Sequence, residues 1–139
     1  MLSGEYFHSF DPKGRMNFPA KMRNELGESF IVTLWSDSCL AVFSNEEWNK
    51  LCGRIRNLPM AQATKIQRFI FPNACEVVPD KQGRILLPQN LRDGAGLKKD
   101  VAVIGVMDRA EIWDLDKWTE NKKAQSASSF EQYLEEFGI

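Results

Sequence analysis

A gapless internal repeat is the feature that most constrains this chain. The segment 11–27 aligns with the segment 80–96, and six of the 17 aligned positions are identical. About one identity would be expected from ordinary composition. The similarity continues, since each copy is followed by an apolar run and a tryptophan at matching positions, in 40–48 and 110–118. The chain therefore predicts two related structural units.

Each copy contains the turn motif Asp-x-x-Gly-Arg, at 11–15 and at 80–84. Asp at the first position and Gly at the fourth suit a type I turn, and Pro12 suits the second position in the first copy. Alternating apolar residues on both sides predict that each turn joins two strands of a half-buried hairpin. The residues interpreted as shaping the turns are Asp11, Gly14, Asp80 and Gly83.

A short helix and a second hairpin are expected after each turn. Pro19 and Pro88 suit the start of a helix, while Gly27 and Gly96 suit a left-handed cap at its end. β-rich runs beginning at Phe30 and at Val101 then predict the second hairpin of each unit.

Two further helices are expected between the copies. A capping box at 44–47 opens the first, and its apolar stripe is interpreted as core packing. That stripe is Trp48, Leu51, Cys52 and Ile55. The second helix, 61–71, places Ile66, Phe69 and Ile70 on one side. No acidic residue lies between Glu47 and Glu76, so this part of the chain is locally basic. This basic stretch is compatible with a contact to nucleic acid and equally compatible with a solvated helical face.

The repeat divides the chain into a first unit at 5–47, a helical linker at 48–73, a second unit at 74–118 and a C-terminal segment at 119–139. The C-terminal segment is polar and acidic, but it also has apolar residues at helical spacing, so both a mobile tail and an amphipathic helix are compatible with it. These apolar residues are Phe130, Tyr133, Leu134 and Phe137.

Length and composition exclude several classes of protein. A chain of 139 residues suits one compact domain or two small fused ones. No apolar run approaches the roughly 20 residues of a membrane helix and the start does not resemble a signal peptide, so a cytoplasmic protein is expected. The three cysteines Cys39, Cys52 and Cys75 are expected to be buried thiols without disulfides.

No enzyme, metal site or cofactor is expected. The chain has neither a Gly-rich phosphate loop nor a Gly-x-Ser-x-Gly elbow. Its only histidine, His8, has no Cys or carboxylate at metal-ligand spacing.

The net charge of -1 conceals a division that matters for nucleic-acid binding. Residues 108–139 contain eight acids and four bases, so the preceding 107 residues contain fourteen bases and eleven acids. The larger part of the chain is therefore net positive, as binding to phosphates requires.

The sequence resembles the MraZ family of bacterial regulators over nearly its whole length, more weakly after Trp118. The segments that carry the resemblance are Asp11–Arg15, Asp80–Arg84, Leu91–Arg92, Ala95–Leu97 and Ile104–Val106. The resemblance implies an α+β fold, in which two fused AbrB-like swapped-hairpin units form a pseudo-two-fold, double-psi-like β-barrel with short helices. It also implies a nucleoid-associated homo-oligomer, a ring of subunits, that binds repeated promoter boxes upstream of its own division and cell-wall gene cluster.

The same resemblance implies that the turns face DNA through Arg15 and Arg84, with Lys13 and Lys81 beside them. A guanidinium at a hairpin tip can fork onto guanine or phosphate, and a turn lysine can contact phosphate. Alternatively, each arginine pairs with its own turn aspartate and only stabilises the hairpin, and the two roles can coexist. The lysine is the third turn residue in copy one and the second in copy two, so the contacts need not be identical.

Arg23 and Arg92 recur on the short helices, where a structural role is favoured over a phosphate clamp. The expected function is sequence-specific binding of double-stranded DNA by an oligomer. The alternative is an oligomeric protein-interaction or assembly module, and an RNA-binding role is a third reading.

Overall fold

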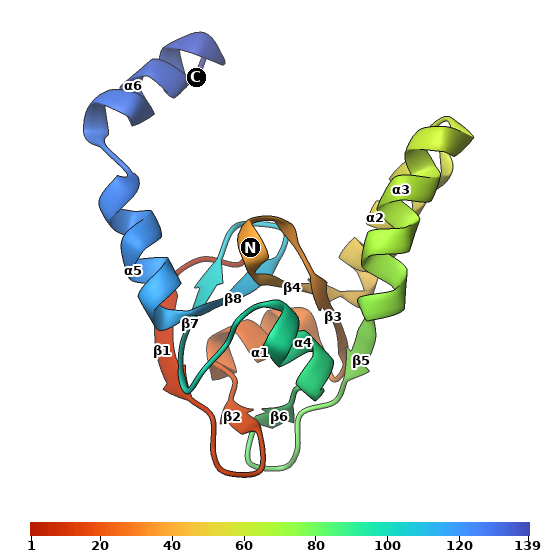
Figure 1. Ribbon diagram of the computed structural model, residues 1–139, viewed down its shortest axis with the longest axis vertical. Coiled ribbons are helices and arrows are strands. Elements are labelled where there is room, and N and C mark those ends of the chain that lie inside the picture. The colour runs from red at the N-terminus through yellow and green to blue at the C-terminus, as the bar shows by residue number, and fades with distance from the viewer.

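The computed structural model describes all 139 residues, and Figure 1 shows a strand-rich body from which two helical arms project. The elements of the first copy are β1 (Glu5–Ser9), β2 (Arg15–Asn17), α1 (Ala20–Leu26), β3 (Phe30–Leu34), η1 (Ser36–Ser38) and β4 (Leu40–Ser44). The helices between the copies are α2 (Asn45–Arg56), α3 (Met60–Ile70) and η2 (Phe71–Asn73). The second copy and the C-terminal segment contain β5 (Cys75–Val77), β6 (Arg84–Leu86), α4 (Gln89–Gly94), β7 (Asp100–Gly105), β8 (Ala110–Asp114), α5 (Leu115–Ala124) and α6 (Ala127–Glu136).

The strands on either side of each turn pair with the other copy. β1 pairs with β7, and β5 pairs with β3, within one antiparallel sheet of order β1-β7-β8-β4-β3-β5. β2 and β6 pair with each other in a separate two-stranded sheet centred on Met16 and Ile85. The expectation of a self-paired hairpin at each turn was therefore wrong, whereas the exchange implied by the resemblance is present. The second hairpins, β3–β4 and β7–β8, form as expected.

The strands do not close into the expected barrel. The larger sheet ends at β1 and β5, and the smaller one has only three residues in each strand. Pro19 and Pro88 follow these short strands closely, and proline has no amide hydrogen with which to extend a strand ladder. The barrel prediction was wrong in this respect, although the pseudo-two-fold α+β arrangement is confirmed.

Both copies contribute to one core of 20 buried residues. The rings of Phe18 and Phe30 lie 5.2 Å apart in it, and Met16 and Ile85 are at most 1% exposed. A shared core means that neither copy buries its apolar face without the other.

The local signals at helix ends are confirmed. α1 and α4 begin directly after Pro19 and Pro88, and Gly27 and Gly96 both have positive φ. The Ser44 hydroxyl accepts the Glu47 amide at 3.1 Å, so it caps α2.

The three cysteines are free, as expected, but only Cys39 is buried. Burial raises the pKa of the Cys39 thiol to about 12. Cys52 and Cys75 are half-buried, because the sequence around each belongs to an arm helix or to an edge strand. No helix has the length and apolarity needed to cross a membrane.

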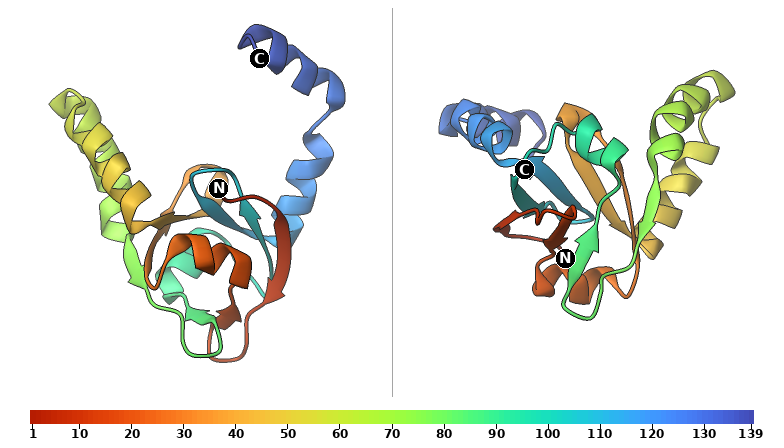
Figure 2. Two further views of the ribbon diagram at one scale, coloured as in Figure 1. Left: turned by 180° about the vertical axis from the view of Figure 1, so that it is seen from behind. Right: turned by 60° about the horizontal axis from the view of Figure 1, so that its bottom comes forward.

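The two arms, α2–α3 and α5–α6, leave the body on opposite sides, and both point away from the two turns (Figure 1). Figure 2 shows the same separation from behind. The turns therefore form one end of the molecule, and the arms extend at the other.

Candidate nucleic-acid interface

The carboxylate of Asp11 accepts the side-chain hydrogen bonds that hold the first turn. Its Oδ1 accepts the backbone amides of Lys13 and Arg15, both at 2.9 Å, and its Oδ2 accepts Nε of Arg15 at 2.8 Å. The Gly14 amide donates to the Asp11 carbonyl at 3.0 Å, which closes the turn. Gly14 has φ +80°, a conformation that side chains rarely adopt.

The second turn repeats this arrangement. Asp80 Oδ1 accepts the amides of Gln82 and Arg84, both at 2.9 Å, and Oδ2 accepts Nε of Arg84 at 2.8 Å. The alternative in which each arginine pairs with its own aspartate is therefore present. Because only Nε is engaged in that pair, both terminal amino groups of each guanidinium are without a hydrogen-bond partner in the chain.

Arg23 and Arg92 cross between the copies and lie behind the turns. A Cβ atom added to Gly14 would lie 3.0 Å from Cζ of Arg92, and one added to Gly83 would lie 2.6 Å from Cζ of Arg23. Nε of Arg23 donates to the Phe18 carbonyl at 3.0 Å, and Nε of Arg92 bonds Leu87 in the same way at 3.1 Å. Each short helix thus supports the other copy's turn, as the favoured structural role predicts.

The two-stranded sheet joins both turns into one surface. Met16 and Ile85 face the core, so the alternating neighbours face outward. The register places Arg15 opposite Leu86 and Asn17 opposite Arg84. Leu86 is 59% exposed, opposite Arg15 and two residues from Arg84 on its own strand. The surface therefore has an arginine at each end and is less polar at the end where Leu86 lies.

The structure brings together the cations that the sequence singled out. Lys13 and Lys81 are exposed on the turns, and Arg15 and Arg84 begin the paired strands beside them. Figure 1 shows the two turns side by side at one end of the body. Sequence reasoning missed the crosswise contacts of Arg23 and Arg92, for which equivalent position in both copies was the only signal. It also missed Asn17 and Leu86, which occupy equivalent positions in the two copies but differ in polarity.

The pKa values of Asp11 and Asp80 lie below the usual 3.8, first because each carboxylate accepts the backbone amide of Arg15 or Arg84. Hydrogen bonds from the arginine side chain and from a further turn amide act in the same direction, against desolvation. A lowered carboxyl pKa stabilises the folded turn above the unfolded pKa, and this contribution is lost as the pH falls through the folded value.

We therefore expect both carboxyls to titrate below pH 3.8 in a carbon-detected NMR titration, with the amide signals of Arg15 and Arg84 moving at the same midpoint. Asp11→Asn should remove only the midpoint of the first turn. A midpoint at or above 3.8 would show that these bonds do not form in solution.

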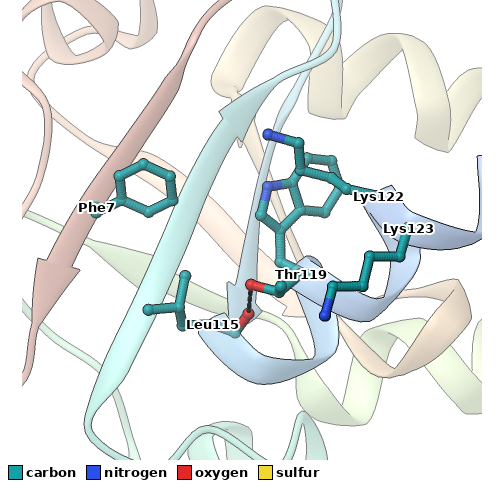
Figure 3. A pocket seen from close by; sticks show the side chains of 6 residues that line it. Phe7, Leu115, Thr119, Lys122 and Lys123 are labelled. Atoms are coloured by element: carbon teal, nitrogen blue, oxygen red, sulfur yellow. Dashed lines mark hydrogen bonds between the residues drawn. The ribbon is translucent and has the colours of Figure 1, made fainter.

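Other parts of the molecule are weaker candidates for a binding site. A hollow of about 430 Å³ beside β1 and α5 is lined by Phe7, Leu115, Trp118 and two lysines (Figure 3). Lys122 is already paired with Glu5 at 3.0 Å, and Trp118 also donates to that carboxylate. His8 is half-buried on β1, and no group of three His, Cys, Asp or Glu residues is placed to hold a metal.

The fold and this surface define a class of protein, in which two interlocked copies of one α+β unit present paired cationic turns at one end. The model of the MraZ protein family matches the chain twice, over residues 1–69 and 70–137. The chain belongs to the MraZ family.

Curated relatives support the same assignment. The chain is 50% identical to "Transcriptional regulator MraZ" of Acetivibrio thermocellus over 91% of this chain and 93% of the relative. Proteins with the same name from Caldicellulosiruptor saccharolyticus and Heliobacterium modesticaldum are 48% and 47% identical. They cover 100% and 97% of this chain, and 100% and 95% of the relatives.

Proposed function

We propose that the protein is a DNA-binding transcriptional regulator that contacts double-stranded DNA with its two turns. The observation that carries the proposal is the pair of cationic turns on one surface, each with a guanidinium held by its aspartate through Nε alone. The names of its relatives support a regulatory role.

The turn residues have separable roles in this proposal. Arg15 and Arg84 are held in place by Asp11 and Asp80, so their terminal amino groups are preorganised for guanine or phosphate. Lys13 and Lys81 add phosphate contacts, which strengthen binding without choosing a sequence.

The two copies are not equivalent on the DNA-facing surface. Asn17 has hydrogen-bonding groups suited to adenine, whereas Leu86 offers only an apolar contact, which suits a thymine methyl group. An asymmetric half-site follows from this difference.

Two turns per chain give weak, salt-sensitive attachment, so tight binding requires several chains acting together. An oligomer such as the ring implied by the family resemblance would present turns at fixed spacing, and it would therefore select DNA with repeated boxes. In line with that resemblance, the target would be the promoter of its own division and cell-wall gene cluster, and the protein would act in the cytoplasm at the nucleoid.

The test is a titration of the full chain against repeated-box promoter DNA and a scrambled duplex at two salt concentrations. We expect tighter binding to the repeated boxes and a steep loss of affinity for both duplexes at higher salt, because counterions are released from the phosphates. Equal affinity for the two duplexes would rule out sequence-specific regulation.

An assembly module without DNA binding is the second candidate, because both arms expose apolar side chains. Phe69 on α3 is 52% exposed and Phe130 on α6 is 61% exposed. A chain that assembles but binds neither duplex in this titration would favour that candidate.

A further inference from the structure

Arg92, on α4 of the second copy, lies against the turn of the first copy. Its Nε donates to the Leu87 carbonyl at 3.1 Å, so the guanidinium is anchored within its own copy. Its Cζ lies 5.8 Å from the centre of the Phe10 ring, at the range of a cation–π contact. A Cβ atom added to Gly14 would lie 3.0 Å from the same Cζ. The guanidinium therefore contacts the first turn both before Asp11 and at Gly14.

Arg23, on α1 of the first copy, has the reciprocal place at the second turn. Its Nε donates to the Phe18 carbonyl at 3.0 Å, and a Cβ atom added to Gly83 would lie 2.6 Å from its Cζ. The second turn is also tied by its backbone, because the Gly83 carbonyl accepts the Phe18 amide at 3.0 Å, and Gly14 has no equivalent bond. The first turn thus depends more on its arginine than the second does.

These contacts give the glycine of each turn a second cause. Gly14 and Gly83 both have φ +80°, which by itself favours glycine. A side chain at either position would in addition displace the guanidinium that lies against it. The Asp-x-x-Gly-Arg motif therefore suits a turn that is supported from the other copy.

We propose that Arg92 and Arg23 are positioning residues for DNA binding, each of which fixes the turn of the opposite copy. Arg92 acts through Arg15, and Arg23 acts through Arg84. Each turn arginine is held only by the aspartate of its own turn, so a turn that shifts carries its guanidinium with it. A displaced guanidinium loses the paired hydrogen bonds to guanine or phosphate, which depend on geometry.

The consequence at DNA rests on the proposed function, but the contact itself is tested without DNA. Hydrogen exchange of backbone amides is measured by mass spectrometry for the segments 11–15 and 80–84. Arg92→Ala should speed exchange about tenfold at 11–15 and leave 80–84 near the parent, because the opening is local. Arg23→Ala should do the reverse, with a smaller change. Faster exchange in both turns of each variant would show a general loss of stability and would overturn the proposal.

A double-mutant cycle then measures the effect on repeated-box DNA, at a salt concentration low enough for single-turn variants to bind. Arg92→Ala should weaken binding about tenfold in the parent and in Arg84→Ala. In Arg15→Ala the same change should cost less than about twofold, because the residue through which Arg92 acts is absent. Equal losses in all three backgrounds would mean that Arg92 contacts phosphate directly, which contradicts a positioning role.

Arg92→Lys separates shape from charge. Lysine keeps the positive charge and a long stem, but it lacks the planar group that lies against Gly14 and the Nε donor that anchors it. Arg92→Lys should therefore bind DNA as weakly as Arg92→Ala, and it carries the comparison if Arg92→Ala does not fold. Binding close to that of the parent would show that only the charge of Arg92 matters, and the proposal would be wrong.

Asn90→Ala is the matched control, because it removes an exposed polar side chain from the same helix. It should match the parent in exchange and in binding, and circular dichroism should show unchanged secondary structure in every variant. A parent that did not prefer repeated-box DNA would overturn the proposed function and the role of both arginines in it, whereas the exchange of each turn would still show whether it is supported from the other copy.

Discussion

Replacing both turn arginines, Arg15→Ala/Arg84→Ala, should abolish tight binding to repeated-box DNA while leaving the chain folded. Each guanidinium fork contributes about 1–3 kcal/mol of discrimination when it meets a base. Loss of two per chain therefore lowers affinity at least about 30-fold, and further in an assembly where the loss recurs in each subunit. A titration by fluorescence anisotropy measures the change.

The matched control is Arg56→Ala, which removes an arginine from the last turn of α2 in the arm that points away from the turns. Its affinity should stay within a small factor of the parent's. If the double variant bound like Arg56→Ala, the turn arginines would be structural only and the contact surface would lie elsewhere.

Phe30→Ala should cause the largest loss of stability and should destabilise both copies at once. Phe30 is fully buried on β3, between β4 of its own copy and β5 of the other, and it packs against Phe18. Truncating a buried phenylalanine costs about 3–5 kcal/mol. Because the copies share one core, urea unfolding should shift to lower concentration and remain a single transition.

The comparison is Phe7→Ala, the same truncation at a side chain that is 58% exposed on β1. It should cost a fraction of the loss at Phe30 at matched protein concentration. Two resolved transitions in Phe30→Ala, with one copy still folded, would contradict the shared core.

The repeat, the turns and the helix ends were predictable from sequence because their causes are local. Asp11 and Asp80 bind amides two and four residues away, and Pro19 and Pro88 act on the helix that follows them. Strand exchange follows from no local rule. Both copies have the same alternation, so pairing within a copy and pairing between copies bury the same residues.

The lysines and arginines of the turns were identified from sequence, but their surroundings were not. Arg92 reaches Gly14, and Arg23 reaches Gly83, only because the strands have exchanged. The difference between Asn17 and Leu86 matters because each of them lies opposite a turn arginine in the two-stranded sheet. The four-part division of the chain and the DNA contacts themselves remain predictions.

Contact between the turns and DNA is tested most directly by photocrosslinking from the turns themselves. A photoreactive amino acid is placed at Lys13 or Lys81, both exposed on the turns, with Lys50 on α2 as the control position. We predict crosslinks to repeated-box DNA from both turn positions and none from position 50. Crosslinks from position 50 alone would contradict the account.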